Sequence, residues 1–205
     1  GEEPLTPIYG DEALFEKPLL GYAAEAVARL TARDPLTRSR LLRALGALLL
    51  VAVTGTTAAG LFGARAGRWS ALVLATSLAL PLAARTDGTQ VFATLFAWIG
   101  AAGLADARFG RPGGRAARLS IAYVALATAL LTAGPLPALW PLGALALYLG
   151  LARDHDGWRE TGIGWGALIV AGLALPWYGA MTERYGVLFL AHAPFFPYAI
   201  EPRGS

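Results

Sequence analysis

Glu16-Lys17 is the first pair of residues in this 205-residue chain that could take part in chemistry. It sets a carboxylate beside an ammonium group, in a polar segment that leads into long apolar stretches. Pro18 fixes the backbone directly after the pair, and apolar side chains follow it. Ionisable residues at the edge of a membrane bundle are costly unless they are paired or functional. The pair therefore marks a lipid–water boundary and a candidate site.

Three other polar residues could join Glu16, and each has a structural alternative. Asp87 follows Arg85 at an expected turn between two apolar segments, where it can cap the next helix or contribute to function. Arg85 either ends the preceding span or binds a phosphate. His192 is either an interfacial residue or, with Glu16, a ligand of a divalent cation, for which zinc is the usual choice. Two ligands so far apart in sequence do not by themselves predict a metal site.

Composition places the chain in a membrane. Hydrophobic residues make up 56% and charged residues 15%, against about 25% charged in average chains, and the mean hydropathy is +0.50. The net charge is +3, but the arginines stand at the ends of apolar stretches, where snorkelling and topology explain them, so nucleic acid is not expected as a partner. The absence of cysteine excludes disulfides, thiolate zinc sites and cysteine nucleophiles.

Six apolar segments are each close to the roughly 20 residues that a helix needs to cross about 30 Å of hydrocarbon. They are Leu41–Phe62, Trp69–Ala84, Thr89–Ala105, Leu119–Ala133, Ala138–Ala152 and Ile163–Met181. The sequence thus predicts an all-α integral membrane bundle of about six transmembrane helices. Apolar residues at helical spacing over 19–30 predict an interfacial amphipathic helix before the bundle. The expected divisions are an external loop and interfacial helix (1–37), the bundle (38–186) and an external C-terminal segment (187–205).

Arginines gather in alternate loops, at residues 64–68, 106–118 and 153–162, and the positive-inside rule places these loops in the cytoplasm. The opposite, external face then receives the polar residues Glu16, Lys17, Arg85, Asp87, Glu183, Arg184 and His192. Four arginines do not fit this orientation, because they fall on the external side before the first span. They could pair there with anionic lipid head groups, and they are Arg33, Arg38, Arg40 and Arg43.

Other patterns have simpler interpretations. Asp-His-Asp at 154–156 could ligate a metal, but a solvated loop is the more economical interpretation. The glycines of 162–166 follow no strand, so they indicate close helix packing rather than a dinucleotide site, and so do the small residues of 55–60. An aromatic belt is expected from the tryptophans near span ends, which are Trp69, Trp158 and Trp177.

Four short motifs occur in a particular order along the chain. They are Leu5-Thr6-Pro7 with Phe15-Glu16-Lys17-Pro18-Leu19; Arg85-Thr86-Asp87; Ala133-Gly134-Pro135; and Leu175-Pro176-Trp177-Tyr178 with Glu183-Arg184-Tyr185-Gly186 and His192. This order resembles the bacterial aminoarabinose transferase and protein mannosyltransferase families. Those families carry a Thr-Pro…(Phe/Tyr)-(Glu/Asp)-Lys-Pro-Pro pattern in the first external loop and a Lys-Gly-Pro turn between later spans.

The resemblance implies a C-type glycosyltransferase of the bacterial inner membrane, a multi-span bundle with an external active site. Such enzymes transfer a sugar from a polyprenyl-phosphate donor to an acceptor such as lipid A or a protein hydroxyl. By the same resemblance, Asp87 is a catalytic carboxylate, and Glu16 and His192 hold a divalent metal (zinc, magnesium or manganese). Donor binding is implied for Lys17, Arg85, Tyr178 and Arg184.

The departures from the family leave two hypotheses. The family's principal catalytic Asp lies at the end of a span before the Thr-Pro motif, and this sequence begins after that point. Ala133, Leu19 and Ala193 replace a lysine, a proline and an asparagine of the family pattern. The chain is either a transferase core that acts when the preceding span is supplied, or a non-catalytic accessory subunit of a membrane complex with other subunits. A transporter is a lesser option, because no inverted repeat is evident.

Overall fold

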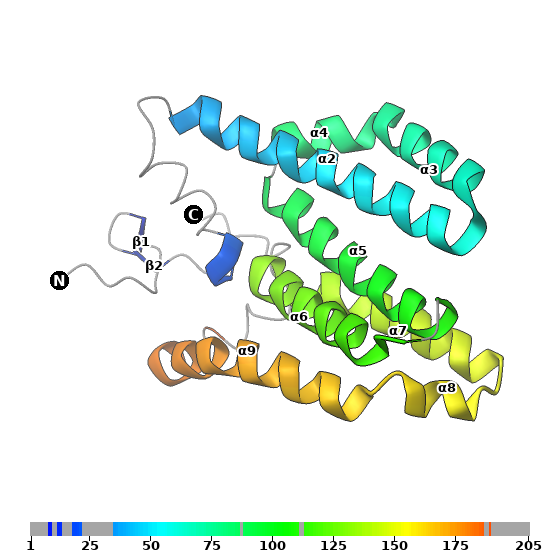
Figure 1. The fold of residues 1–205 in the computed structure, drawn as a ribbon. Coiled ribbons are helices and arrows are strands. Elements are labelled where there is room, and N and C mark those ends of the chain that lie inside the picture. Colours follow the sequence, from blue (N-terminus) through cyan, green and yellow to red (C-terminus); the bar gives the residue numbers. More distant parts are fainter. Residues whose placement is uncertain are drawn as a thin grey trace.

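The computed structural model describes residues 8–9, 12–13, 18–21, 35–86, 88–110, 113–186 and 189. Its elements, labelled as in Figure 1, are β1 (Ile8–Tyr9), β2 (Glu12–Ala13), α2 (Pro35–Phe62), α3 (Ala64–Thr76), α4 (Ala79–Thr86), α5 (Gly88–Phe109), α6 (Arg115–Ala133), α7 (Leu136–Leu151), α8 (His155–Glu160) and α9 (Ile163–Tyr185). The two short strands pair antiparallel. The predicted all-α membrane bundle is confirmed. Leu19–Gly21 is helical, and the rest of the expected interfacial helix lies outside the described residues.

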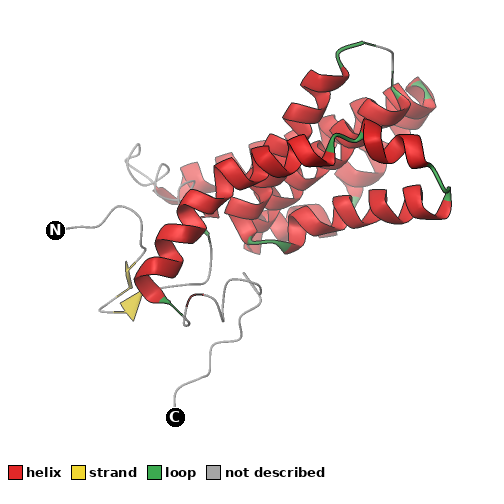
Figure 2. Cartoon of the chain, turned by 90° about the horizontal axis from the view of Figure 1, so that it is seen from below, coloured by secondary structure: helices red, strands yellow, loops and turns green. Residues whose placement is uncertain are grey.

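The helices run back and forth, so that their ends gather at two ends of the bundle (Figure 1). At one end α2 and α5 begin and α4 and α9 finish; we call this the motif end. The connection from α5 to α6 and the helix α8 lie at the other, the loop end. Figure 2 shows the two short strands at the motif end, beyond the bundle.

Four apolar helical stretches in the described chain are long enough to cross a membrane, namely Thr37–Phe62, Thr89–Phe109, Arg115–Ala133 and His155–Tyr185. Helices α3 and α4 provide a fifth candidate as a broken span, bent by 51°. Helix α7 has 16 residues and is about 24 Å long, so it falls short of the roughly 30 Å of hydrocarbon. The six expected segments therefore all correspond to helices, and four or five of them meet the length requirement.

The break between α3 and α4 corrects the expectation of one continuous span over Trp69–Ala84. Ser77 leaves the helical conformation, and its backbone N–H and its hydroxyl both donate to the carbonyl of Leu74. Pro81 lies four residues beyond Ser77, has no N–H to donate and would clash with the Ser77 carbonyl in a continuous helix. The proline is accommodated in the first turn of α4, where no such bond is needed.

Helices α5 and α6 form the centre of the bundle. Half of the most apolar stretch of α6 is buried, against 11% of that of α2. The two helices approach closely at Gly100 and Gly103, where an added Cβ would lie 2.6 Å from Leu126 and 2.8 Å from Ala122. The core around this contact consists of Leu104, Ala107, Leu119, Ala122, Tyr123, Leu126 and Ala138.

Helix α9 docks on α6 through a glycine and a tyrosine. The buried Tyr123 donates a hydrogen bond to the carbonyl of Thr161 at 2.9 Å, and its ring lies so close to Gly166 that a Cβ there would overlap it. The expected helix packing of residues 162–166 is thus confirmed at Gly166, whereas Gly164 has open space around it. In the same way α3 meets α2 where Gly67 faces the carbonyl of Gly55.

Replacement of Gly166 by alanine should destabilise the bundle by about 1–3 kcal/mol, because the new methyl group has no room beside the Tyr123 ring. Gly164→Ala is the matched control on the same turn of α9, and it should be neutral or slightly stabilising because alanine favours the helix. Thermal unfolding of both variants in detergent measures the difference. Equal melting temperatures would contradict the packing described here.

Candidate functional site

Two segments far apart in sequence meet at the motif end. Trp177, Met181 and Phe189 form a buried cluster, against which Leu19 packs, and Pro18 is fully buried. We call it the Trp177–Phe189 cluster. Pro18 and Leu19 directly follow Glu16-Lys17, and Phe189 precedes His192 by three residues. The packing therefore joins the chain just after the first motif to the chain near the last.

Aromatic contacts give this cluster its shape. Trp177 meets Tyr178 edge-on at 4.9 Å between ring centroids, and it meets Phe189 edge-on at 5.6 Å. Such pairs contribute about 0.5–1.5 kcal/mol beyond the area that they bury. Trp177 is only 8% exposed, so its predicted place in an aromatic belt is wrong, whereas Trp69 and Trp158 remain exposed. Phe189 contacts Trp177 directly, and Leu19, which is distant in sequence, packs against the same cluster.

The described donor-binding candidates fall into two groups. Tyr178 belongs to the cluster, and its buried hydroxyl has no hydrogen-bond partner within the described ranges. Arg184 is exposed near the end of α9, with its guanidinium over the Tyr185 ring at 5.7 Å. Arg85 lies instead at the end of α4, a helix that packs on α2 and α5, whereas α9 packs on α6. Tyr178 and Arg184 therefore share the last turns of α9, whereas Arg85 is on a different helix.

Four predicted site residues, Glu16, Lys17, Asp87 and His192, lie outside the described part of the chain, and their roles stay predictions. In the part that is described, no group of three or more His, Asp or Glu side chains could hold a metal ion. The sequence analysis did not identify Leu19 and Phe189 as residues that bring the two segments together at the Trp177–Phe189 cluster. Their only signal was apolar character beside a polar motif.

Several charged residues at the loop end form ion pairs with one another. Asp154 accepts a hydrogen bond from Arg108 at 2.6 Å, and its other oxygen accepts from the N–H of Gly157, which caps α8. Glu160 lies 3.6 Å from Arg108 and 3.4 Å from Arg115. Asp154 is thus occupied in a structural role, while its neighbours at 155 and 156 are exposed, which favours the interpretation of Asp-His-Asp as a loop.

The helical fold of the chain is similar to part of the fold of a solved membrane protein. Two solved structures that share it are both of ArnT from Cupriavidus metallidurans. The structure bound to undecaprenyl phosphate matches with a TM-score of 0.82 and 23% identity over 93% of this chain, and the apo structure with 0.79 and 23% over 96%. The chain spans 36% of the length of ArnT. No protein-family model and no curated protein sequence matches the chain.

Truncation of the Phe189 side chain should destabilise the Trp177–Phe189 cluster. Phe189→Ala removes a fully buried ring that two aromatic residues contact, and a cost of about 3 kcal/mol is expected. Leu175→Ala is the control, since Leu175 is on α9 and 64% exposed. Thermal unfolding in detergent reports the effect. If Phe189→Ala were as stable as the control, the packing of Phe189 would not contribute to the stability of the protein.

The Asp154 pair makes stability depend on pH. The hydrogen bond from Arg108, followed by that from the Gly157 N–H, lowers the pKa of Asp154 below its ordinary value. A lowered folded-state pKa contributes stability above the unfolded value of about 3.9, and this stability is lost as pH falls through the folded value. The wild-type protein should therefore be more stable than Asp154→Asn at pH 7, and the difference should shrink below about pH 4. Chemical denaturation in detergent over this range measures it; a constant difference would contradict the ionised pair.

Proposed function

We propose that the chain is the donor-binding core of a membrane glycosyltransferase, which transfers a sugar from a polyprenyl-phosphate donor to an acceptor at the external face of the bacterial inner membrane. The observation that carries the proposal is the packing of Leu19 against the Trp177–Phe189 cluster, because Leu19 follows Glu16-Lys17 in the chain and Phe189 precedes His192. The ArnT fold supports it, since one ArnT structure contains undecaprenyl phosphate.

In this proposal the donor phosphate lies between Lys17 and Arg184, whose positive charges stabilise the phosphate as it leaves. Tyr178 supports it from the cluster, where its buried hydroxyl can donate to a donor oxygen. An acceptor hydroxyl oxygen attacks the anomeric carbon of the sugar, and the bond from that carbon to the phosphate oxygen breaks. Polyprenyl phosphate departs, and Asp87, just before α5, takes the proton of the acceptor hydroxyl.

Glu16 and His192 are the proposed ligands of a divalent cation. A carboxylate and an imidazole form a donor set that suits zinc better than magnesium. Leu19, near Glu16 in the chain, and Phe189, near His192, belong to one packed cluster. This supports the proposal that Glu16 and His192 lie close enough to share a cation. A cation there would neutralise charge that develops on the leaving phosphate.

One observation favours the second candidate, a non-catalytic accessory subunit. Ala133 stands where the resembled families have the lysine of the Lys-Gly-Pro turn, and it is completely buried at the end of α6. A cationic side chain is therefore missing from a position that the families use, and the space around it is already filled. An accessory subunit would keep the fold but show no turnover.

The test is the release of polyprenyl phosphate from a labelled polyprenyl-phosphate sugar, by a preparation in nanodiscs that includes the native sequence preceding Gly1. Lys17→Ala should lower the rate by about a hundredfold, as expected for the loss of a group that stabilises transition-state charge. Arg159→Ala, an exposed cation at the loop end, is the control and should leave the rate unchanged.

A chelator should also stop the reaction, and added zinc should restore it. Unchanged turnover in Lys17→Ala would rule out the phosphate role of that lysine. Absence of turnover from the wild-type preparation, together with its purification in a stable complex with other membrane subunits, would favour the accessory subunit.

A further inference from the structure

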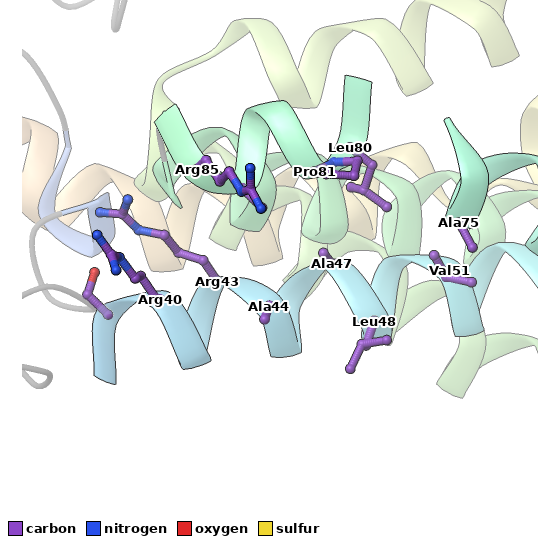
Figure 3. Close-up of a pocket in the computed structure, with 12 residues that line it drawn as sticks. Arg40, Arg43, Ala44, Ala47, Leu48, Val51, Ala75, Leu80, Pro81 and Arg85 are labelled. Atoms are coloured by element: carbon purple, nitrogen blue, oxygen red, sulfur yellow. The ribbon is translucent and has the colours of Figure 1, made fainter. Parts of the chain in front are cut away.

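A groove of about 920 Å³ lies between α2 on one side and α3 and α4 on the other (Figure 3). Its walls are apolar for most of their length, with Ala47, Leu48 and Val51 on α2 and Leu80 and Pro81 on α4. Leu48 is 66% exposed, so the groove opens toward the surroundings of the bundle, which for these helices is the bilayer.

Three arginines stand at one mouth of the groove. Arg40 and Arg43 lie on successive turns of α2, and Arg85 reaches in from the end of α4 (Figure 3). No aspartate or glutamate is found among the described residues that line the groove. Guanidinium groups match the geometry of phosphate oxygens and bind them through paired hydrogen bonds. The mouth is therefore suited to a phosphate.

The location of this charge needs an explanation. The positive-inside rule places the arginine-rich loops of the loop end in the cytoplasm. The arginines at the groove mouth lie at the opposite end, against the expected distribution of positive charge between the two faces of a membrane. An anionic head group at this end would be attracted by the three positive charges.

The length of the groove indicates which kind of anionic ligand would fit it. From Ser39 to Val51 the α2 wall rises about 18 Å, which is close to the roughly 15 Å of one hydrocarbon leaflet. A ligand that fits both ends has its phosphate at the arginines and an apolar chain that reaches the depth of one leaflet. A membrane phospholipid has these dimensions.

We propose that this groove binds one anionic phospholipid, with its phosphate on Arg40, Arg43 and Arg85 and an acyl chain along Leu48 and Pro81. Because the arginines come from α2 and α4, the lipid bridges the broken span to its neighbour and holds the two together. The site is separate from the Trp177–Phe189 cluster, and its occupation does not depend on transferase activity.

Native mass spectrometry of the protein, purified in detergent with equal amounts of phosphatidylglycerol and phosphatidylcholine, tests the proposal. One phosphatidylglycerol molecule should be retained. The double variant R40Q/R43Q should weaken its retention by about tenfold or more, because it removes charged hydrogen bonds to the phosphate. Arg85→Gln should act in the same direction from the opposite wall. Arg38→Gln is the matched control, since Arg38 is exposed on the same helix and does not line the groove.

Several results would overturn the proposal. Equal retention of both lipids would remove the selectivity for the anionic lipid. An equal loss in Arg38→Gln would mean that the arginines only snorkel to head groups without forming a site. Displacement by stoichiometric polyprenyl phosphate would assign the groove to the donor, and displacement by inorganic phosphate alone would show that the acyl chain does not contribute. Elution as a single species and unchanged helical circular dichroism confirm that each variant folds. An inactive enzyme that still retains phosphatidylglycerol would leave the proposal intact.

Discussion

The close approach of α5 and α6 is the constraint on which the rest of the bundle depends. Apolar helices in lipid gain little from hydrophobic burial, so their association relies on backbones that can come near one another. Gly100 and Gly103 allow this approach, because larger residues would collide with Leu126 and Ala122. Helix α2 then packs on α5, while α9 packs on α6. The helices α2 and α4, which line the groove, therefore pack on α5, whereas α9, which carries Trp177, packs on α6.

Charge is distributed differently at the two ends of this bundle. At the loop end, Arg108, Arg115 and Arg118 have carboxylate partners within the protein, and these ion pairs connect α5, α6 and α8. At the motif end, the described lining of the α2–α4 groove contains arginines without carboxylates, and the Tyr178 hydroxyl is buried without a partner within the described ranges. Clustered charges and a buried polar hydroxyl inside a membrane protein are costly, and the ligands proposed above would lie beside them. Both proposed ligands are phosphate-bearing lipids.

The fold could be predicted from the sequence because span length and apolar composition depend on local residues alone. The break at Ser77 was missed although Pro81 signalled it, since hydropathy alone does not distinguish a continuous span from a bent one. Trp177 was misassigned to an aromatic belt, because its burial involves Phe189 and a cluster that Leu19 joins from far away in the sequence. The motif order indicated that the two ends of the chain share a site. It gave no indication that Arg85 shares a groove with the arginines of α2, which requires knowledge of how helices pack.

The ion pair between Arg108 and Asp154 has a consequence for the order in which the molecule assembles. Its partners are 46 residues apart, and both precede α9 in the chain. During synthesis, α5, α6 and α7 can therefore close into a locked unit before α9 has been made. Helix α9 then docks on a surface that is already complete, with Gly166 on the ring of Tyr123. Phe189 comes later still in the chain, and it joins the cluster against which Leu19, from near the start of the chain, is packed. The Trp177–Phe189 cluster can therefore be completed only after every helix of the bundle has been synthesised.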